Sequence, residues 1–370
     1  MKNTNAQQRN SLNALRGIGI TGIFFYHLCP SFVPGGFLGV PLFFVLSGYF
    51  MFLTSERSWN NHTFHIGRYY QKRFLKIYPS LITMVLLVCC YMTLSNDQQM
   101  IGIRSEIAGI FLGYNNWWQI AQHASYFSRL SNTSCFTHLW FLSMEIQFYL
   151  LWPFLFLLYK KIECNHVLSA YLHVPSKFLY HSGQECKNTA SAGTTKLYYG
   201  FLVLAIVSLV RMLYLYVPGK DPSRVYYGTD TMSFCILIGI FVAAYQTHHT
   251  TCPTQCHAQA KNANVIILQN NSSTYDFPVL SLRKLYGILA LSVLLIGILF
   301  ATIHGTMPFL YQGGMFLLCL FYGALILLIN RYKTSLSTNP IVAAFAWLGR
   351  HSYEIYLWHY PIIILVANSL

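Results

Sequence analysis

The chain alternates long apolar runs with short polar segments. Apolar runs occupy 12–29, 37–53, 75–95, 138–159, 197–217, 227–246, 285–303, 308–330 and 341–367. Most approach the roughly 20 residues that cross a bilayer as an α-helix. A weaker run at 106–114 is too short to cross comfortably, and it is predicted to be an interfacial or re-entrant element or part of a tenth helix. The pattern predicts an all-α, polytopic membrane bundle of nine or ten transmembrane helices without a soluble domain, spanning 12–368 behind a cytoplasmic tail at 1–11.

Composition supports this class of protein. Hydrophobic residues make up 55% of the chain and charged residues 9%, whereas soluble domains carry about 25% charged residues. The formal net charge of +14 would suggest a nucleic-acid partner for a soluble protein. No nucleic-acid-binding motif is present, and basic loops that face anionic lipid explain the charge. We therefore expect membrane lipid, and no nucleic acid, as a partner.

The basic residues are distributed unevenly between the two sets of loops. With nine spans and an inner N-terminus, the inner segments hold sixteen Lys and Arg residues outside the spans, and the outer loops hold four: Arg104, Arg129, Lys220 and Arg224. This asymmetry follows the positive-inside rule. A tenth crossing at 102–122 would invert every segment after it.

Ten cysteines show no regular framework. The stretch HHTTCPTQCH, residues 248–257, has a C-x3-C spacing found in some zinc sites. Because no second ligand pair lies at a regular distance, we predict a thiol-bearing cytoplasmic loop and no metal.

The first apolar run contains two ionisable residues, Arg16 and His27. They are eleven residues apart, close to three helical turns, so both lie on one helix face about 16 Å apart along the axis. Arg16 is predicted near the inner end and His27 near the outer end. A snorkelling arginine and a packing histidine would also fit. An ionisable group within a membrane helix more often faces a cavity or a partner, so the functional interpretation is preferred.

The fourth run repeats this arrangement. His138, Glu145 and Tyr149 follow one another at spacings of seven and four residues, which place them on one face. A catalytic role for Glu145 and a structural pairing with an arginine from another helix both remain open.

Two further segments hold candidate residues. Tyr226 and Tyr227 stand before the sixth span, where tyrosines also form interfacial belts. In the last run Ser352, Tyr356 and His359 share a face, and Arg350 and Glu354 are an i,i+4 pair. Arg350 is predicted near the inner surface, where it could bind phosphate.

These segments together resemble the acyltransferase 3 family. The motifs, in order, are LNALRGIGITGIFFYHL, VPGGFLGVPLFFVLSGYF, RYYQKRFLKIYP, HLWFLSMEIQFYLLWP, DPSRVYYGTDT and LGRHSYEIYLWHYPI. The resemblance covers Leu12 to about Ile364. The segment around Tyr226 is most similar to the branch that O-acetylates peptidoglycan in bacteria. Members are integral membrane enzymes that O-acylate carbohydrates, usually with acetyl-CoA as the donor.

The resemblance implies roles for several residues. It implies that Arg16 and His27 are essential, and that Phe43 to Gly48, Lys72, Arg73, Glu145 and Tyr149 stand at recurrent positions. The chain departs from the family where Asn13, Pro41 and Met232 replace charged residues. Many members carry a further soluble domain after the last helix. Because this sequence stops at Leu370, we expect direct transfer to the acceptor or a separate extracytoplasmic transferase.

The sequence therefore predicts an O-acetyltransferase of the bacterial plasma membrane with a carbohydrate acceptor. Arg16, Lys72, Arg73, Lys76 and Arg350 would bind CoA, and His27 would act as general base. A tyrosine near the outer face, Tyr149, Tyr226 or Tyr227, would carry the acyl group transiently. The alternatives are a transporter or flippase of a lipid-linked sugar and a non-catalytic membrane scaffold.

Overall fold

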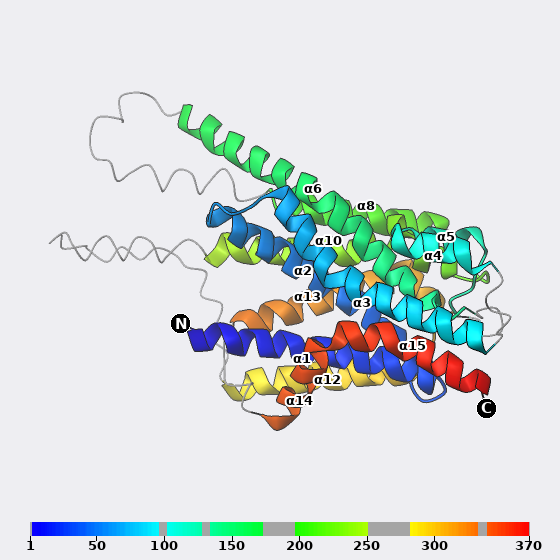
Figure 1. Cartoon of the computed structure of the whole chain (residues 1–370). Coiled ribbons are helices and arrows are strands. Elements are labelled where there is room, and N and C mark those ends of the chain that lie inside the picture. The colour runs from blue at the N-terminus through cyan, green and yellow to red at the C-terminus, as the bar shows by residue number, and fades with distance from the viewer. Residues whose placement is uncertain are drawn as a thin grey trace.

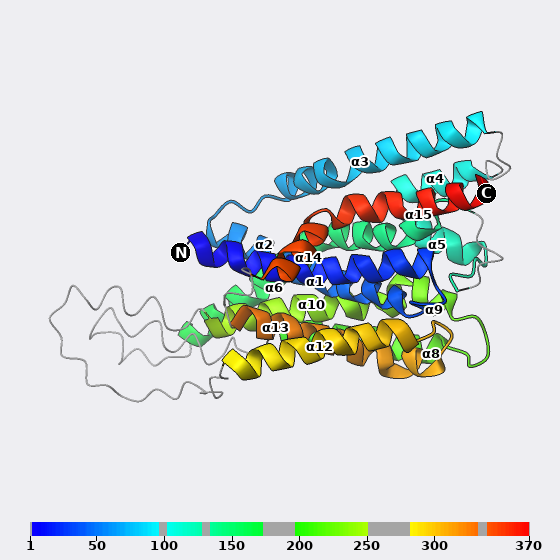
Figure 2. The ribbon, with the colours of Figure 1, turned by 90° about the horizontal axis from the view of Figure 1, so that it is seen from below.

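The protein folds as a bundle of roughly parallel helices (Figure 1). The computed structural model describes residues 2–95, 102–127, 134–172, 197–250, 282–331 and 339–369, and within these ranges the chain forms helices and no strand. Successive long helices run in opposite directions, as expected when apolar runs cross a bilayer in turn (Figures 1 and 2). The two termini lie at opposite ends of the bundle (Figure 1). We call the end where α1 begins the inner end, following the predicted orientation, and the other the outer end.

The described helices are α1 (Lys2–Leu28), η1 (Gly36–Leu38), α2 (Gly39–Asn60), α3 (Ile66–Leu94), α4 (Ile103–Phe111), α5 (Asn115–Ala121), η3 (Thr137–Leu139), α6 (Trp140–Leu172), α8 (Tyr199–Leu215), α9 (Ser223–Tyr227), α10 (Thr229–Thr250), α12 (Leu282–Thr302), η6 (Leu310–Gly314), α13 (Met315–Arg331), α14 (Pro340–Arg350) and α15 (Ser352–Ser369).

Within the part of the chain that the structure describes, six helical segments are long and apolar enough to cross a membrane: Gly36–Asn60, Ile66–Leu94, Thr137–Glu163, Thr229–His249, Arg283–Thr302 and Leu310–Asn330. They coincide with six of the predicted runs and confirm the polytopic helical class. In Gly36–Asn60, 78% of the most apolar stretch is buried inside the bundle. In Arg283–Thr302 the buried share is 22%. The helix α2 therefore lies in the core, whereas α12 presents apolar side chains such as Leu291 outward, as expected for a helix that faces lipid.

The first helix is longer than the sequence predicts. The helix α1 begins at Lys2 and so includes most of the predicted tail 1–11. Arg16 lies 14 residues after Lys2 and 12 before Leu28, and it stays close to the inner end of the apolar run that starts at residue 12. A guanidinium within an apolar run requires polar surroundings supplied by other helices.

The weak run 106–114 falls on the short helix α4 and the turn after it, and the short helix α5 follows, both at the outer end (Figure 1). The nine residues of α4 are about 14 Å long at 1.5 Å per residue, which is too short to cross a bilayer. The segment 102–122 therefore does not form a tenth crossing.

The predicted single span 341–367 is wrong, because the chain forms two helices there that meet at His351. The first, α14, packs against α1, and Ile341 and Phe345 line an apolar groove with α1 and α12. The second, α15, continues to the outer end (Figure 1). The break places Ser352 and Tyr353, at the start of α15, beside Arg16 of α1.

Candidate functional site

Five helices enclose a central cavity of about 80 Å³. Its apolar walls come from Ile23, Phe43, Ile77 and Phe141. Its polar lining consists of Arg16 of α1, Ser47 of α2, Arg73 and Lys76 of α3, Glu145 and Tyr149 of α6, and Ser352, Tyr353 and Tyr356 of α15. The structure therefore brings together seven residues that the sequence analysis names individually: Arg16, Arg73, Lys76, Glu145, Tyr149, Ser352 and Tyr356.

The cavity carries an excess of positive charge. Arg16, Arg73 and Lys76 face one carboxylate, Glu145, and no ion pair joins any of them among the described residues. The Glu145 carboxylate instead accepts a hydrogen bond from the Ser47 hydroxyl. The guanidinium of Arg16 lies 4.8 Å from the centre of the Phe50 ring, and that of Arg73 lies 4.5 Å from the centre of the Tyr149 ring. Cations held this way inside a bundle favour an anionic ligand.

A second hollow of about 260 Å³, which we call the vestibule, opens between α2 and α3 towards the inner end. It is lined by Thr54, Ser55, Ser58, Thr63, Phe64, His65, Arg68, Tyr69, Lys72, Arg73 and Lys76. Arg73 and Lys76 line both the vestibule and the central cavity. The basic residues thus form a continuous path from the inner end of the bundle to Arg16.

Three histidines meet on the outer side of this cavity. The ring of His27 lies 5.3 Å from that of His359, and the ring of His138 lies 5.5 Å from that of His359. Tyr360 completes the group, with its ring 4.8 Å from His27 and 5.1 Å from His138. We call these four residues the histidine cluster. His138 and His359 are buried, whereas His27 is partly exposed, so a substrate from the outer end would meet His27 first.

Tyr356 separates the cavity from the histidine cluster. Its side chain lines the cavity, its ring lies 5.3 Å from that of His138, and its hydroxyl donates a hydrogen bond to the His138 carbonyl oxygen. The predicted shared face of Ser352, Tyr356 and His359 therefore runs from the cavity into the cluster. Arg16 and His27 share one face of α1 but belong to different sites, on either side of Tyr356.

Tyr226 and Tyr227 lie in a buried aromatic group and not in the cavity. Both are fully buried, and the Tyr226 hydroxyl donates a hydrogen bond to the Phe37 carbonyl oxygen. Burial, with further contributions from neighbouring tyrosines, raises the pKa of Tyr226 well above its ordinary value. Tyr126 connects this group to His27, with ring centres 4.8 Å from Tyr226 and 6.4 Å from His27.

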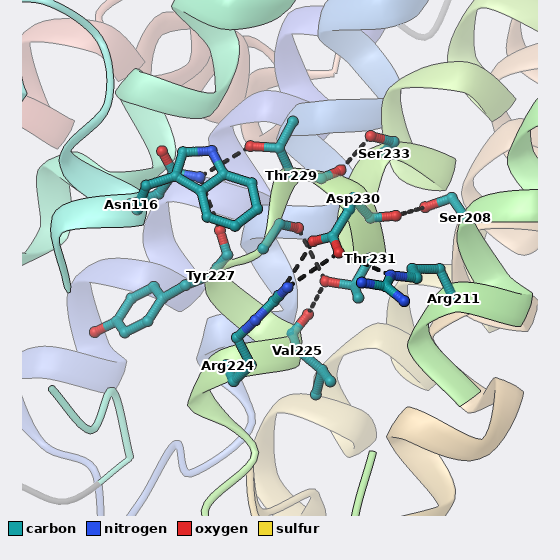
Figure 3. A network of polar contacts seen from close by, with 12 residues as sticks. Asn116, Ser208, Arg211, Arg224, Val225, Tyr227, Thr229, Asp230, Thr231 and Ser233 are labelled. Carbon is teal, nitrogen blue, oxygen red and sulfur yellow. Dashed lines mark hydrogen bonds and ion pairs between the residues drawn. The ribbon is translucent and has the colours of Figure 1, made fainter. Parts of the chain in front are cut away.

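The GTDT segment, Gly228 to Thr231, joins α9 to α10 through a polar network (Figure 3). Asp230 accepts hydrogen bonds from Arg224 and Arg211, and Thr231 donates to the Val225 carbonyl oxygen. Asn116 of α5 donates to Thr229, and Thr229 donates to Gln147 of α6. The network fixes the position of α9 against α5 and α6, and with it that of Tyr226 and Tyr227. The buried Met232 takes no part in these bonds.

A comparison with protein families supports this assembly of motifs, because the family described as "Acyltransferase domain" matches residues 9–370. The chain belongs to this acyltransferase family. It is a multi-pass membrane protein. No solved structure matches the chain.

The chain is similar to bacterial relatives. It is 31% identical to the peptidoglycan O-acetyltransferase OatA of Listeria monocytogenes, over 100% of this chain and 52% of that protein. It is 29% identical to the putative peptidoglycan O-acetyltransferase YrhL of Bacillus subtilis, over 96% of this chain and 48% of that protein. A putative O-acetyltransferase of Staphylococcus aureus is 27% identical over 96% of this chain and 51% of that protein. The chain spans about half the length of these curated relatives.

Two predicted donor-site residues of this acyltransferase lie apart from the cavity. Lys72 lines the vestibule. Arg350 lies at the end of α14, is exposed, and donates a hydrogen bond to Asn10. Arg350 and Glu354 fall on separate helices and form no ion pair within the described ranges. Arg350 therefore contacts the first half of α1 and lines neither the cavity nor the vestibule.

The structure adds two residues to the site that sequence reasoning missed: Tyr360, which contacts His27, and Tyr126, which connects His27 with Tyr226. It also gives Ser47, within the recurrent segment Phe43 to Gly48, a hydrogen bond to Glu145. Ser47 lies in the FFVLSG motif and Tyr360 directly follows His359, so both positions carried a signal. Tyr126 stands in a polar loop without a motif. The predicted metal-free stretch 248–257 lies largely outside the described residues, which contain no cluster of potential metal ligands.

Proposed function

We propose that this acyltransferase moves an acyl group, in the default case acetyl, from acetyl-CoA to a hydroxyl of a cell-surface or cell-wall carbohydrate. The family assignment and the relatives named as peptidoglycan O-acetyltransferases support this reaction class. They also favour a peptidoglycan-like acceptor and a place in a bacterial plasma membrane. The acceptor would approach from the outer end, directly or through a separate extracytoplasmic transferase.

The observation that carries the proposal is the unpaired positive charge of the cavity and vestibule. CoA brings several phosphate charges and a long, narrow pantetheine arm. Lys72, Arg73 and Lys76 would hold the phosphates at the inner side. The arm would extend past Arg16 towards Tyr356, since a cavity of about 80 Å³ accepts a narrow chain and not a nucleotide.

The reaction itself would occur at the histidine cluster. His27 removes the proton of the acceptor hydroxyl, and the hydroxyl oxygen attacks the thioester carbonyl carbon. The carbon–sulfur bond breaks, the ester forms, and the CoA thiolate leaves with the bonding electron pair and takes up the proton that His27 removed, which restores neutral His27. Tyr356 lines the donor cavity and its ring contacts His138 and His359 of the cluster, so in this scheme the acetyl group passes this side chain before transfer.

Glu145 and Tyr149 would organise the donor pocket in this scheme. The Glu145 carboxylate accepts from Ser47 and balances part of the cationic charge, and Tyr149 supports Arg73 through its ring face. Of the three tyrosines considered as transient acyl carriers, Tyr149 lines the cavity. Tyr226 and Tyr227 do not line it, and the raised pKa of Tyr226 makes its phenol a poor nucleophile.

The test is release of CoA from acetyl-CoA by the purified protein in lipid nanodiscs, with soluble peptidoglycan fragments as acceptor and ester formation followed by mass spectrometry. The wild type should release CoA and form ester in equal amounts. His27→Ala should lower kcat by about 100-fold or more, the range that a general base contributes. A transporter or a scaffold would consume no thioester, and equal rates for folded His27→Ala and wild type would exclude His27 as the base.

A further inference from the structure

Three helices carry an apolar or aromatic side chain between the cavity and the histidine cluster. On α1, Ile23 follows Arg16 by seven residues and precedes His27 by four. Spacings of three, four and seven residues place side chains on one face of a helix, so Ile23 lies on the face of α1 that runs from the cavity to the cluster. Phe141 of α6 and Tyr356 of α15 have matching positions. Each stands three or four residues from a polar cavity residue and from a histidine: Glu145 and His138 for Phe141, and Ser352 and His359 for Tyr356.

Ile23, Phe141 and Tyr356, which we call the collar, are closely packed. All three line the cavity, and their exposed fractions are only 3%, 7% and 6%. The rings of Phe141 and Tyr356 lie 5.2 Å apart, centre to centre. The Tyr356 hydroxyl donates a hydrogen bond to the His138 carbonyl oxygen, which ties its ring to the segment just before α6. A group that moves from the cavity to the cluster therefore has to displace packed side chains.

The collar belongs to the helices that position the histidines. His27 lies on α1, His138 lies in η3 just before α6, and His359 lies on α15. The other two apolar wall residues of the cavity are Phe43 of α2 and Ile77 of α3, and these helices contribute nothing to the histidine cluster. The collar residues, unlike Phe43 and Ile77, therefore stand on the route of the transferred group.

The cavity is small for a donor with a long acyl chain. Its volume is about 80 Å³. An apolar cavity of roughly 150 Å³ binds benzene, a molecule of six carbon atoms. Once the narrow end of the donor arm lies in the cavity, no room is left for a hydrocarbon tail beside it. A longer tail has to enter the collar, where each additional methylene displaces side chains in a close-packed interior.

We propose that the collar selects the acyl group by its length, an inference that rests on the proposed transfer from acyl-CoA. An acetyl group, with a single methyl, passes between Ile23, Phe141 and Tyr356. A butyryl group, which is two methylenes longer, is excluded. The three collar residues are then specificity-determining residues, which act through the size of the group and take no part in making or breaking bonds.

The measurement is kcat/KM for acetyl-, propionyl- and butyryl-CoA, from CoA release by the protein in nanodiscs with peptidoglycan fragments as the acceptor. The ratio of two donors on one preparation does not depend on the fraction of the protein that is folded. One methylene in a fitted apolar pocket changes kcat/KM by about 10- to 200-fold, so the wild type should use propionyl-CoA at least about tenfold less well than acetyl-CoA, and butyryl-CoA less well still. A butyryl-CoA value within about twofold of the acetyl-CoA value would overturn the inference.

Ile23→Ala removes three carbon atoms from the collar and should raise the ratio of kcat/KM for butyryl-CoA to that for acetyl-CoA at least about tenfold. Two matched deletions are the controls. Ile77→Ala removes the same atoms from another part of the cavity wall, and Ile20→Ala removes them from a buried position on α1 that lines neither the cavity nor the vestibule. Both controls should keep the wild-type ratio. An increase in either control equal to that in Ile23→Ala would overturn the inference, because the collar would then not set the length.

A smaller substitution decides if Ile23→Ala does not fold. Ile23→Val removes one carbon atom and should raise the ratio for propionyl-CoA over acetyl-CoA about threefold or more, and an unchanged ratio would contradict the proposal. The proposed function fails by a different result. A wild type that releases no CoA from any of the three donors would refute the acyl transfer itself, whereas equal release from acetyl- and butyryl-CoA would refute only the selection by length.

Discussion

Glu106 is a single buried residue whose titration should be visible in the stability of the whole protein. It lies on α4 at the outer end, is 3% exposed, and accepts hydrogen bonds from Ser134 and Gln119. Burial raises the pKa of Glu106 to about 7, although these two hydrogen bonds favour the charged form. In an unfolded chain a glutamate titrates near pH 4.3, so the folded state prefers the protonated carboxyl.

The sign of the pH dependence follows from this raised pKa. The stabilisation by protonated Glu106 is complete below the unfolded pKa and is lost as the pH rises through about 7. Thermal melting in detergent should therefore show wild-type stability falling between pH 5 and pH 8. Glu106→Gln should remove about 2–4 kcal/mol of that change. The exposed Glu354→Gln is the control, and a wild-type slope left intact by Glu106→Gln would contradict this account.

The residue scale also shows what could be predicted from sequence. The eleven-residue spacing predicts that Arg16 and His27 lie on one face of a helix. In the structure Arg16 lines the cavity and the His27 ring contacts that of His359. Spacing could not show that they belong to separate sites, because Tyr356 and His359 come from α15 and Arg73 from α3. Such contacts between distant segments depend on helix packing, which a single sequence with no contact information does not reveal.

At the scale of helices, the close crossing of α1 and α14 depends on two glycines. A Cβ atom at Gly349 would lie 1.8 Å from the Asn13 carbonyl oxygen, and one at Gly17 would lie 2.0 Å from the Phe345 carbonyl oxygen. Because these neighbours are backbone atoms, a methyl group can be accommodated only if the helices move apart. The crossing holds Ser352 and Tyr353 beside Arg16.

Gly349→Ala should therefore destabilise the protein by about 1–3 kcal/mol, the usual range for overpacking, and should lower activity because α15 shifts. The matched control is Gly287→Ala on α12, where an added Cβ meets no atom within 4 Å and alanine is the better helix former. The melting temperature and the rate of CoA release should both be lower in Gly349→Ala than in Gly287→Ala. Equal melting temperatures would show that α14 does not pack closely on α1.

The hydropathy pattern predicts where helices lie better than it predicts where they begin and end. Six predicted runs coincide with long apolar helices, because twenty apolar residues in sequence leave few alternatives. The break at His351 was missed, since the run 341–367 is apolar on both sides of it and contains no proline at the break. The extension of α1 to Lys2 was missed because polar residues also form helix where no membrane selects against them.

At the scale of the whole molecule, the path of the chain places its termini at opposite ends of the bundle (Figure 1). The excess of basic residues in the segments predicted to be inner predicts that the N-terminus faces the cytoplasm and the C-terminus the other side of the membrane. Alkaline phosphatase fused after Leu370 should therefore be active in a bacterial host, and green fluorescent protein at the same place should be dark. Phosphatase activity from an N-terminal fusion should be absent. An active N-terminal phosphatase with a fluorescent C-terminal fusion would show an inverted bundle, and both termini on the same side would show an even number of crossings.

The central claim is that the unpaired cations of the cavity and vestibule bind the donor. The most direct measurement is equilibrium binding of CoA to the protein in nanodiscs, comparing Arg73→Gln with Arg350→Gln. Arg73 lines both hollows, whereas Arg350 is exposed and bonded to Asn10. We predict that Arg73→Gln raises Kd at least about tenfold, or about 1.4 kcal/mol, and that Arg350→Gln changes it less than about twofold. Equal affinities of the two variants, or no CoA binding by the wild type, would contradict the account.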